Sequence, residues 1–278
     1  MSRSNPTTMR RPQPTDPGRV YITGAGPGDP ELITLKGARV LGEADVIVYD
    51  RLANPELLAH TTPDSEHIYV GKRPGKPSVS QDQINRILVS KAQDGRVVVR
   101  LKGGDPFIFG RGGEECEALI AAGIPFEVIP GISSSIAAPA YAGIPVTHRN
   151  HARSFAVVTG HTIDGSDLFA NWEHLSQIDT LVVLMGVKHL PQIIRTLQKY
   201  GRSPDTPVSL IENATLPEQR TCTATLGTIV EKTVSFSSPA TVVIGELAAM
   251  SNDLAWFQQQ EVEASPSTAT DRIQKFAI

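Results

Sequence analysis

The chain has 278 residues, of which 40% are hydrophobic and 20% are charged, and its 26 basic and 29 acidic side chains nearly balance. This length suits two domains with a real core, and the balanced charge excludes the basic footprint of a nucleic-acid-binding protein. No apolar run is long enough to span a membrane. Two cysteines, Cys116 and Cys222, are too few for a disulfide framework or a cysteine metal site, so we expect both to be reduced packing residues in a cytoplasmic protein. No metal-ligand spacing occurs in the sequence, so we expect no metal.

Both ends of the chain are polar. Residues 1–18 contain several prolines and lack the apolar segment of a secretory signal, so we predict a disordered arm. Residues 258–278 are predicted to be a flexible tail for the same reason.

The first predicted strand, residues 19–24, leads into the loop Gly24-Ala25-Gly26-Pro27-Gly28-Asp29-Pro30. This loop resembles a dinucleotide-binding fingerprint, and Asp50 follows where a ribose-binding acid would stand. Asp29 occupies the place of the third glycine, however, and Pro27 prevents a helix from starting directly after the second. A dinucleotide-dependent oxidoreductase is therefore disfavoured, although the loop still lets a ligand approach.

The stretch at 97–115 is the most informative. A β-branched run breaks at Gly103-Gly104-Asp105-Pro106, which cannot continue a strand. Arg111 and Glu114 follow among three more glycines, where a helix is predicted to begin. Charged groups on a glycine-rich loop past the carboxyl end of a strand are typical of ligand sites in open α/β sheets.

Strands and helices alternate along the whole folded part, which indicates an α/β protein. We predict two α/β domains, residues 19–146 and 147–257. The predicted helices are 34–43, 80–93, 112–122, 136–141, 189–200 and 228–232, and the predicted strands after the first are 46–49, one starting at Val97, 126–129, 154–159, 180–184, 208–211, 220–226 and 240–244.

Several motifs together resemble the tetrapyrrole methylase family. They extend from about Arg19 to Phe257 and are the loop at 24–30, the strand end at 46–51, the stretch Arg100 to Glu115, Pro130-Gly131-Ile132-Ser133-Ser134, Tyr141 to Arg149, Thr159-Gly160-His161, Met185-Gly186 and Ser238-Pro239-Ala240.

The resemblance implies two α/β domains with S-adenosylmethionine in the cleft between them, and a homodimer. By motif, the implied cofactor contacts are Pro27, Gly103, Gly104, Asp105, Ile108, Ser133, Ser134, Met185, Ala214 and Ala240. Two positions depart from the family pattern. Ser133-Ser134 replaces the frequent Thr-Ala, and Leu184 replaces the usual aromatic residue before Met185.

The implied reaction transfers methyl groups from two S-adenosylmethionine molecules to C2 and C7 of uroporphyrinogen III, giving precorrin-2 and S-adenosylhomocysteine. Because the substrate carries eight carboxylates, and arginine pairs bidentately with carboxylate, we expect Arg51, Arg111 and Arg149 to bind it. Glu114 is implied as a proton acceptor or as the residue that orients Arg111, and His161 as a further substrate-binding residue or an alternative proton acceptor.

Three alternatives remain at this stage. A later corrin-ring methyltransferase, such as a precorrin-4 methylase, shares the family motifs. An oxidoreductase and a non-catalytic binding protein belong to other classes and are disfavoured by Asp29 and by the intact ligand-loop motifs, respectively. We expect a stand-alone methylase with neither nucleic-acid nor membrane partners.

Overall fold

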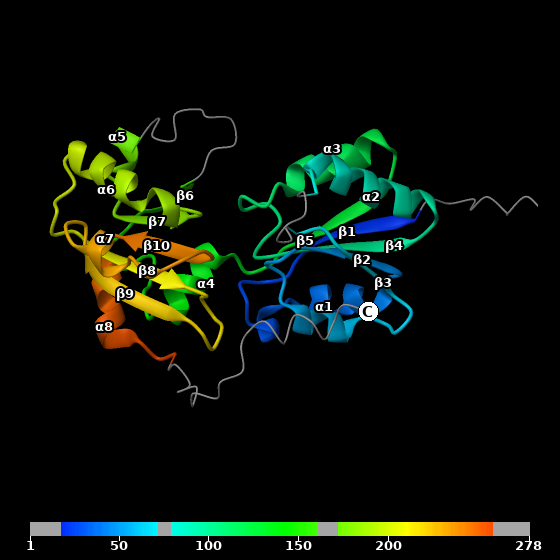
Figure 1. Cartoon of the computed structure of the whole chain (residues 1–278), viewed down its shortest axis with the longest axis horizontal. Helices are drawn as coiled ribbons and strands as arrows, with labels where there is room; N and C mark the ends of the chain where they lie inside the picture. Colours follow the sequence, from blue (N-terminus) through cyan, green and yellow to red (C-terminus); the bar gives the residue numbers. More distant parts are fainter. Residues whose placement is uncertain (1–17, 72–78, 161–171, 258–278) are drawn as a thin grey trace, which may run out of the picture.

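The computed structural model describes residues 18–71, 79–160 and 172–257, which form two lobes built around one β-sheet each (Figure 1). The predicted tail and, apart from Gly18, the predicted arm lie outside these residues. Within the described ranges, no helix is both long and apolar enough to cross a membrane.

The first sheet is parallel and has the strand order β3-β2-β4-β1-β5. Val98 and Val99, neighbours in β4, are both fully buried, one against α2 and α3 and the other against α1, as expected for a parallel sheet covered on both faces. The bounds are β1 Arg19–Gly24, α1 Leu35–Glu43, β2 Val46–Tyr49, β3 Glu66–Tyr69, α2 Gln81–Gln93, β4 Val97–Lys102, α3 Gly112–Ala121 and β5 Phe126–Ile129, with short 3-10 helices at Pro30–Leu32 and Pro55–His60.

The second sheet is mixed, in the order β6-β7-β10-β8-β9, and β10 runs antiparallel to both of its neighbours. Its bounds and those of its helices are β6 Phe155–Thr159, α5 Trp172–Leu175, β7 Thr180–Leu184, α6 Leu190–Lys199, β8 Pro207–Glu212, β9 Arg220–Thr225, α7 Ile229–Lys232, β10 Ala240–Ile244 and α8 Ser251–Leu254, with 3-10 helices at Val187–His189 and Glu246–Met250.

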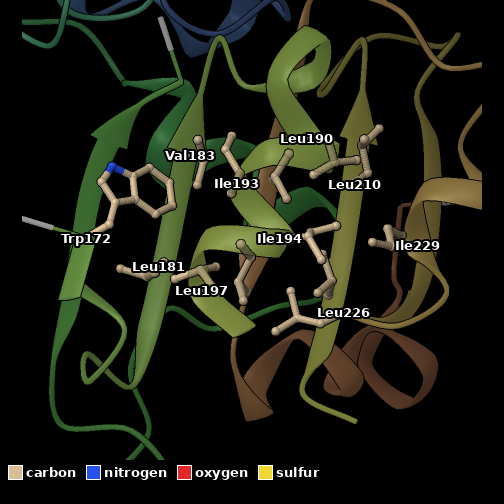
Figure 2. Close-up of a cluster of buried hydrophobic side chains, with 13 residues drawn as sticks. Trp172, Leu181, Val183, Leu190, Ile193, Ile194, Leu197, Leu210, Leu226 and Ile229 are labelled. Atoms are coloured by element: carbon tan, nitrogen blue, oxygen red, sulfur yellow. The ribbon is translucent and has the colours of Figure 1, made fainter. Parts of the chain in front are cut away.

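One face of this sheet is covered by α6. Its apolar residues Leu190, Ile193, Ile194 and Leu197 recur at the spacing of one helical face. They are buried, and they share a core with residues of the sheet such as Leu181 (Figure 2).

The helix α4, Ser134–Tyr141, follows the first sheet in the sequence but packs on the second. Ala138 and Ala142 share a core with Ile211 and Val243, because small side chains let the helix lie close to the sheet face that α6 leaves open. We therefore propose that the boundary between the two domains lies before α4, near Pro130, and not at residue 146 as the sequence suggested.

The other predicted elements agree well with the structure. The strands at 46–49, 126–129, 180–184 and 240–244 are confirmed with their bounds, and Ser80 and Gln83 form a capping box at the start of α2. The strand β3 is not predicted from the sequence, because its four residues are partly exposed at the sheet edge and show no strong apolar pattern.

Candidate active site

Three glycines bring the loops after β1, β4 and β5 into backbone contact. A Cβ atom built on Gly131 would lie 2.3 Å from the Gly104 carbonyl oxygen and 2.7 Å from the Gly24 Cα atom. Only glycine fits at such a close approach. The carboxyl ends of three parallel strands thus meet at one edge of the sheet, where open α/β sheets bind ligands.

Gly104 lies next to the serine loop. Its backbone has a φ of +68°, and among the described residues a Cβ atom built there would meet the Ser133 Cα and the Ser134 nitrogen, both at 3.9 Å, which is ordinary van der Waals contact. The Ser133 hydroxyl caps α4 by accepting a hydrogen bond from the Ser135 backbone nitrogen at 3.2 Å. Predicted cofactor residues from two different strand ends therefore lie together.

Asp105 ties two of these loops to each other. Its Oδ1 accepts a hydrogen bond from the Phe107 nitrogen at 2.8 Å, and its Oδ2 accepts one from the Gly131 nitrogen at 3.1 Å. Each carboxylate oxygen can still accept a further hydrogen bond. Asp105 can therefore hold the two loops together and also bind a ligand, as predicted.

An exposed apolar turn follows Asp105. Phe107, Ile108 and Phe109 are 58%, 41% and 45% exposed, respectively, and Phe109 has the left-handed φ of 53°. Adjacent exposed apolar side chains next to polar loops are typical of a ligand-binding surface.

The second sheet contributes three predicted cofactor residues, which lie at the same end of three neighbouring strands. Met185 follows β7, Ala214 follows β8, and Ala240 begins the antiparallel strand β10. Met185 is 48% exposed and has a φ of 56°. Left-handed backbone in a non-glycine residue is costly and is found preferentially at functional sites.

The loops of the two sheets touch next to Pro27 and Ala214. A Cβ atom built on Gly28 would lie 3.1 Å from the Ala214 carbonyl oxygen and 2.9 Å from the Thr215 Oγ1 atom. The structure therefore joins the predicted cofactor residues of the first sheet to those of the second at this contact.

Arg111 and Glu114 form a bidentate ion pair at the start of α3. The Arg111 Nε and Nη2 atoms donate to the two Glu114 carboxylate oxygens at 2.8 Å and 2.6 Å. This hydrogen bonding lowers the pKa of Glu114 and raises that of Arg111. Both side chains are nearly half exposed, so they are accessible to a ligand, and the arrangement favours Glu114 as the residue that orients Arg111.

The other predicted substrate residues are spread more widely. Arg51 is exposed directly after β2, at the same sheet edge as the Arg111 loop. Arg149 lies shortly before Arg153 and Ser154, whose backbone nitrogens donate to the Asp179 carboxylate. Asp179 precedes β7 and so stands at the opposite end of that strand from Met185. His161 lies outside the described residues.

A buried cluster of charges, which the sequence analysis missed, lies beside this edge. The Glu115 Oε1 atom accepts hydrogen bonds from Arg100 Nε at 3.1 Å and Lys102 Nζ at 3.0 Å, and Arg100 Nη2 donates to Asp50 Oδ2 at 2.8 Å. Glu115, Arg100 and Lys102 are at most 4% exposed. Burial and the Arg100 charge lower the pKa of Lys102.

The charge cluster fixes α3 and the end of β2 on strand β4. The cluster could have been predicted from the spacing of Arg100 and Lys102. They stand two residues apart in a strand, which places both cations on the same face. Glu115 is the acidic residue that α3 turns toward that face.

Two cavities are lined by described residues. One, of about 520 Å³, is lined by Thr147, His148, Arg149, Ala152 and Arg153. The other, of about 400 Å³, is mostly apolar and lies between α4 and Trp256. In the part of the chain that the structure describes, no cluster of three or more histidine, cysteine, aspartate or glutamate side chains is arranged to hold a metal ion.

Comparison with known proteins gives consistent matches. The uroporphyrinogen-III C-methyltransferase of Priestia megaterium is 52% identical over 83% of this chain and 98% of its own length. The siroheme synthase of Actinobacillus pleuropneumoniae is 48% identical over 88% of this chain, which spans only 51% of that protein.

Two solved structures share the fold. A uroporphyrin-III C-methyl transferase from Thermus thermophilus, complexed with S-adenyl homocysteine, is 43% identical and matches 84% of this chain and 99% of its own with a TM-score of 0.73. A cobalt precorrin-4 methyltransferase matches 82% of this chain and 94% of its own with a TM-score of 0.73, but is only 26% identical. The model of the tetrapyrrole (corrin/porphyrin) methylases matches residues 19–230. The fold, the loop motifs and these matches together show that the chain belongs to the tetrapyrrole methylase family.

Proposed function

We propose that this protein transfers methyl groups from S-adenosylmethionine to C2 and C7 of uroporphyrinogen III, giving precorrin-2 and S-adenosylhomocysteine. The observation that carries the proposal is the meeting of the Gly104 and Ser133 loops at the carboxyl edge of the first sheet. The same motifs occur in a fold shared with a uroporphyrin-III methyltransferase that was solved with S-adenyl homocysteine.

The loops fit this cofactor. Gly104 has no Cβ atom and lies next to Ser133 and Ser134, so backbone amides and hydroxyls can approach a ligand closely. The carboxylate of Asp105 can accept bonds from ribose hydroxyls or an ammonium group. Pro27 and Gly103 complete this side, Ile108 supplies apolar contact, and we assign Met185, Ala214 and Ala240 to the opposite wall.

The reaction mainly requires that the protein position the methyl donor and the acceptor carbon. S-adenosylmethionine, when bound, supplies a methyl group activated by its sulfonium. A pyrrole carbon provides the electron pair for the new carbon–carbon bond, the carbon–sulfur bond breaks to leave a neutral thioether, and the methylated ring then loses a proton. Holding the carbon in line with the methyl group can account for much of the rate increase.

The exposed arginines suit a substrate with eight carboxylates. Arg111 presents a guanidinium fixed by Glu114, and we propose that it binds a substrate carboxylate together with Arg51. Because the pKa of Glu114 is lowered by Arg111, Glu114 is a weak base, and we assign it the orientation of Arg111. Arg149 and His161 stay in the proposal as further substrate contacts.

We also propose that the protein is a homodimer in the cytoplasm, and both points rest on the family resemblance.

The second candidate function is methylation of a later corrin-ring intermediate, since a precorrin-4 methyltransferase shares the fold. Its lower identity of 26%, against 43% for the uroporphyrin-III enzyme, supports the first candidate.

Substrate profiling with methyl-labelled S-adenosylmethionine tests the choice. We expect label in the tetrapyrrole fraction with uroporphyrinogen III and none with precorrin-4. Label transferred only to precorrin-4 would overturn the proposed substrate while keeping the reaction type.

A further inference from the structure

Asp29, the residue that breaks the dinucleotide fingerprint, connects three parts of the molecule. Its Oδ2 atom accepts a hydrogen bond from the Tyr141 hydroxyl of α4 at 3.0 Å. Its backbone nitrogen donates to the Thr215 Oγ1 atom, in the loop after β8, at 2.9 Å. Its Oδ1 atom accepts from the Glu31 nitrogen at 2.9 Å and so fixes the carboxylate. A loop of the first sheet is thereby tied to two elements that belong to the second.

Gln219 closes these contacts into a ring. Its Oε1 atom accepts from the Thr215 nitrogen at 2.9 Å, and its Nε2 atom donates to the Tyr141 carbonyl oxygen at 3.2 Å. Thr215 and Gln219 are only 3% and 5% exposed. Hydrogen bonds shielded from water in this way are stronger than exposed ones and costly to leave unmade.

The ring holds a strained loop in place. Asn213 and Thr215, on either side of Ala214, have positive φ angles of 48° and 70°. Left-handed backbone is costly for a non-glycine residue and persists where the surroundings enforce it. Gly28 leaves the room for this, because a Cβ atom there would lie 2.9 Å from the Thr215 Oγ1 atom.

We propose that Asp29, Tyr141, Thr215 and Gln219 are positioning residues that hold the Pro27-Gly28 loop of the first lobe against Ala214 of the second and so set the spacing of the cofactor-binding loops. This inference rests on the proposed function. It also explains why aspartate stands where a dinucleotide fingerprint has glycine. A glycine would lack the carboxylate that the Tyr141 hydroxyl needs.

The state of Tyr141 suits this role. Burial and the hydrogen bond to Asp29 raise the pKa of Tyr141 to about 12, so the hydroxyl remains a donor at neutral pH. The ring also packs against Trp256 and Phe257, at centroid distances of 4.9 Å to each. A phenylalanine can keep this packing while losing only the hydrogen bond.

Tyr141→Phe therefore tests the proposal with S-adenosylhomocysteine as the calorimetric probe. We expect the dissociation constant to rise about tenfold, or 1.4 kcal/mol, while the rate at saturating substrates changes less. The matched control is Tyr200→Phe, because the Tyr200 hydroxyl forms no hydrogen bond with the other residues that the structure describes. Wild-type affinity in Tyr141→Phe, or an equal loss in Tyr200→Phe, would overturn the proposal.

A second pair keeps the test independent of the folding of Tyr141→Phe. Thr215→Val removes the oxygen that accepts from Asp29 but keeps the branched shape, whereas Thr215→Ser keeps the oxygen. We expect weaker binding in the valine variant and near wild-type binding in the serine variant, and equal affinities would contradict the proposal. If the wild-type protein itself does not bind S-adenosylhomocysteine, the proposed function fails with it, an outcome that differs from a variant-specific failure.

Discussion

Arg111 and Glu114 face each other one turn apart at the start of α3, with both guanidinium-to-carboxylate hydrogen bonds at or below 2.8 Å. Arg111 itself has a left-handed φ of 60°. A strained backbone and a bidentate pair together fix the direction in which this exposed cation points. Its place beside the glycine loops makes it the first arginine to test.

Replacing Glu114 by glutamine keeps the size of the side chain but removes the charge that orients Arg111. We expect the KM for uroporphyrinogen III to rise about tenfold, a change of 1.4 kcal/mol, with little change in affinity for S-adenosylhomocysteine. Steady-state kinetics measure the first and calorimetry the second. Glu117→Gln, an exposed position on the same helix, is the control. Turnover of Glu114→Gln with wild-type kinetics would remove the orienting role.

Replacing Gly131 by alanine should disrupt the meeting point of the three loops. The new Cβ atom would lie 2.3 Å from the Gly104 carbonyl oxygen, so the backbone must shift, at an expected cost of about 1–3 kcal/mol in the free energy of unfolding. Gly113→Ala, where no described atom beyond its own helix lies within 4 Å of the Cβ position, should be neutral or stabilising. Urea unfolding compares the two, and equal stabilities would show that the loops do not need this close contact.

Asp105 variants separate its two hydrogen bonds. Alanine leaves the amides of Phe107 and Gly131 without their carboxylate, and asparagine keeps one acceptor oxygen. Each lost bond to a charged group is worth about 1.5–3 kcal/mol. We expect stability and affinity for S-adenosylhomocysteine to fall in the order wild type, Asn, Ala. Unchanged affinity in Asp105→Ala would exclude Asp105 from the cofactor site.

We expect mutations in the buried charge cluster to destabilise the protein to different degrees. Glu115→Ala leaves two buried cations without their shared partner, and breaking a buried pair in this way costs about 3–5 kcal/mol. Lys102→Met should cost less, because burial lowers the pKa of Lys102 and an apolar side chain suits that site. Chemical denaturation at neutral pH measures both, and the reverse order would show that Glu115 is not the centre of the cluster.

The ionisation of Glu212 should make the free energy of unfolding depend on pH. Burial opposes its ionisation, but hydrogen bonds from the Ser237 backbone and hydroxyl, both at 2.7 Å, and from Arg220 outweigh it and lower the pKa. A lowered folded-state pKa stabilises the protein above the ordinary glutamate value of about 4.3. This contribution is lost as the pH falls through the lowered pKa.

The Glu212→Gln variant checks this sign. It should be less stable than wild type at pH 7, and the difference in unfolding free energy should shrink below about pH 4. Thermal melts across this range make the comparison. A difference that does not depend on pH would mean that the charge of Glu212 contributes nothing.

Local patterns in the sequence predict much of the fold. The β-branched runs give the strands, Ser80 and Gln83 give the start of α2, and the glycines of the 103–104 and 131 loops indicate the ligand edge. These features depend on residues within a few positions of each other, so periodicity and turn chemistry are enough.

Other features depend on contacts that no local pattern contains. The helix α4 packs on the second sheet because of side chains more than 60 residues further along. The bond between Asp29 and Tyr141 joins positions 112 residues apart. The segment that follows Arg149 is likewise fixed by Asp179, which accepts a hydrogen bond from the Arg153 nitrogen, and a motif alone could not show this contact.

The most direct test of the account is anaerobic incubation of the protein with S-adenosylmethionine and uroporphyrinogen III, followed by mass analysis of the tetrapyrrole. We predict a gain of two methyl groups, with an equal amount of S-adenosylhomocysteine formed per methyl group transferred. An unmodified tetrapyrrole, from protein that still binds S-adenosylhomocysteine, would contradict uroporphyrinogen III as the substrate.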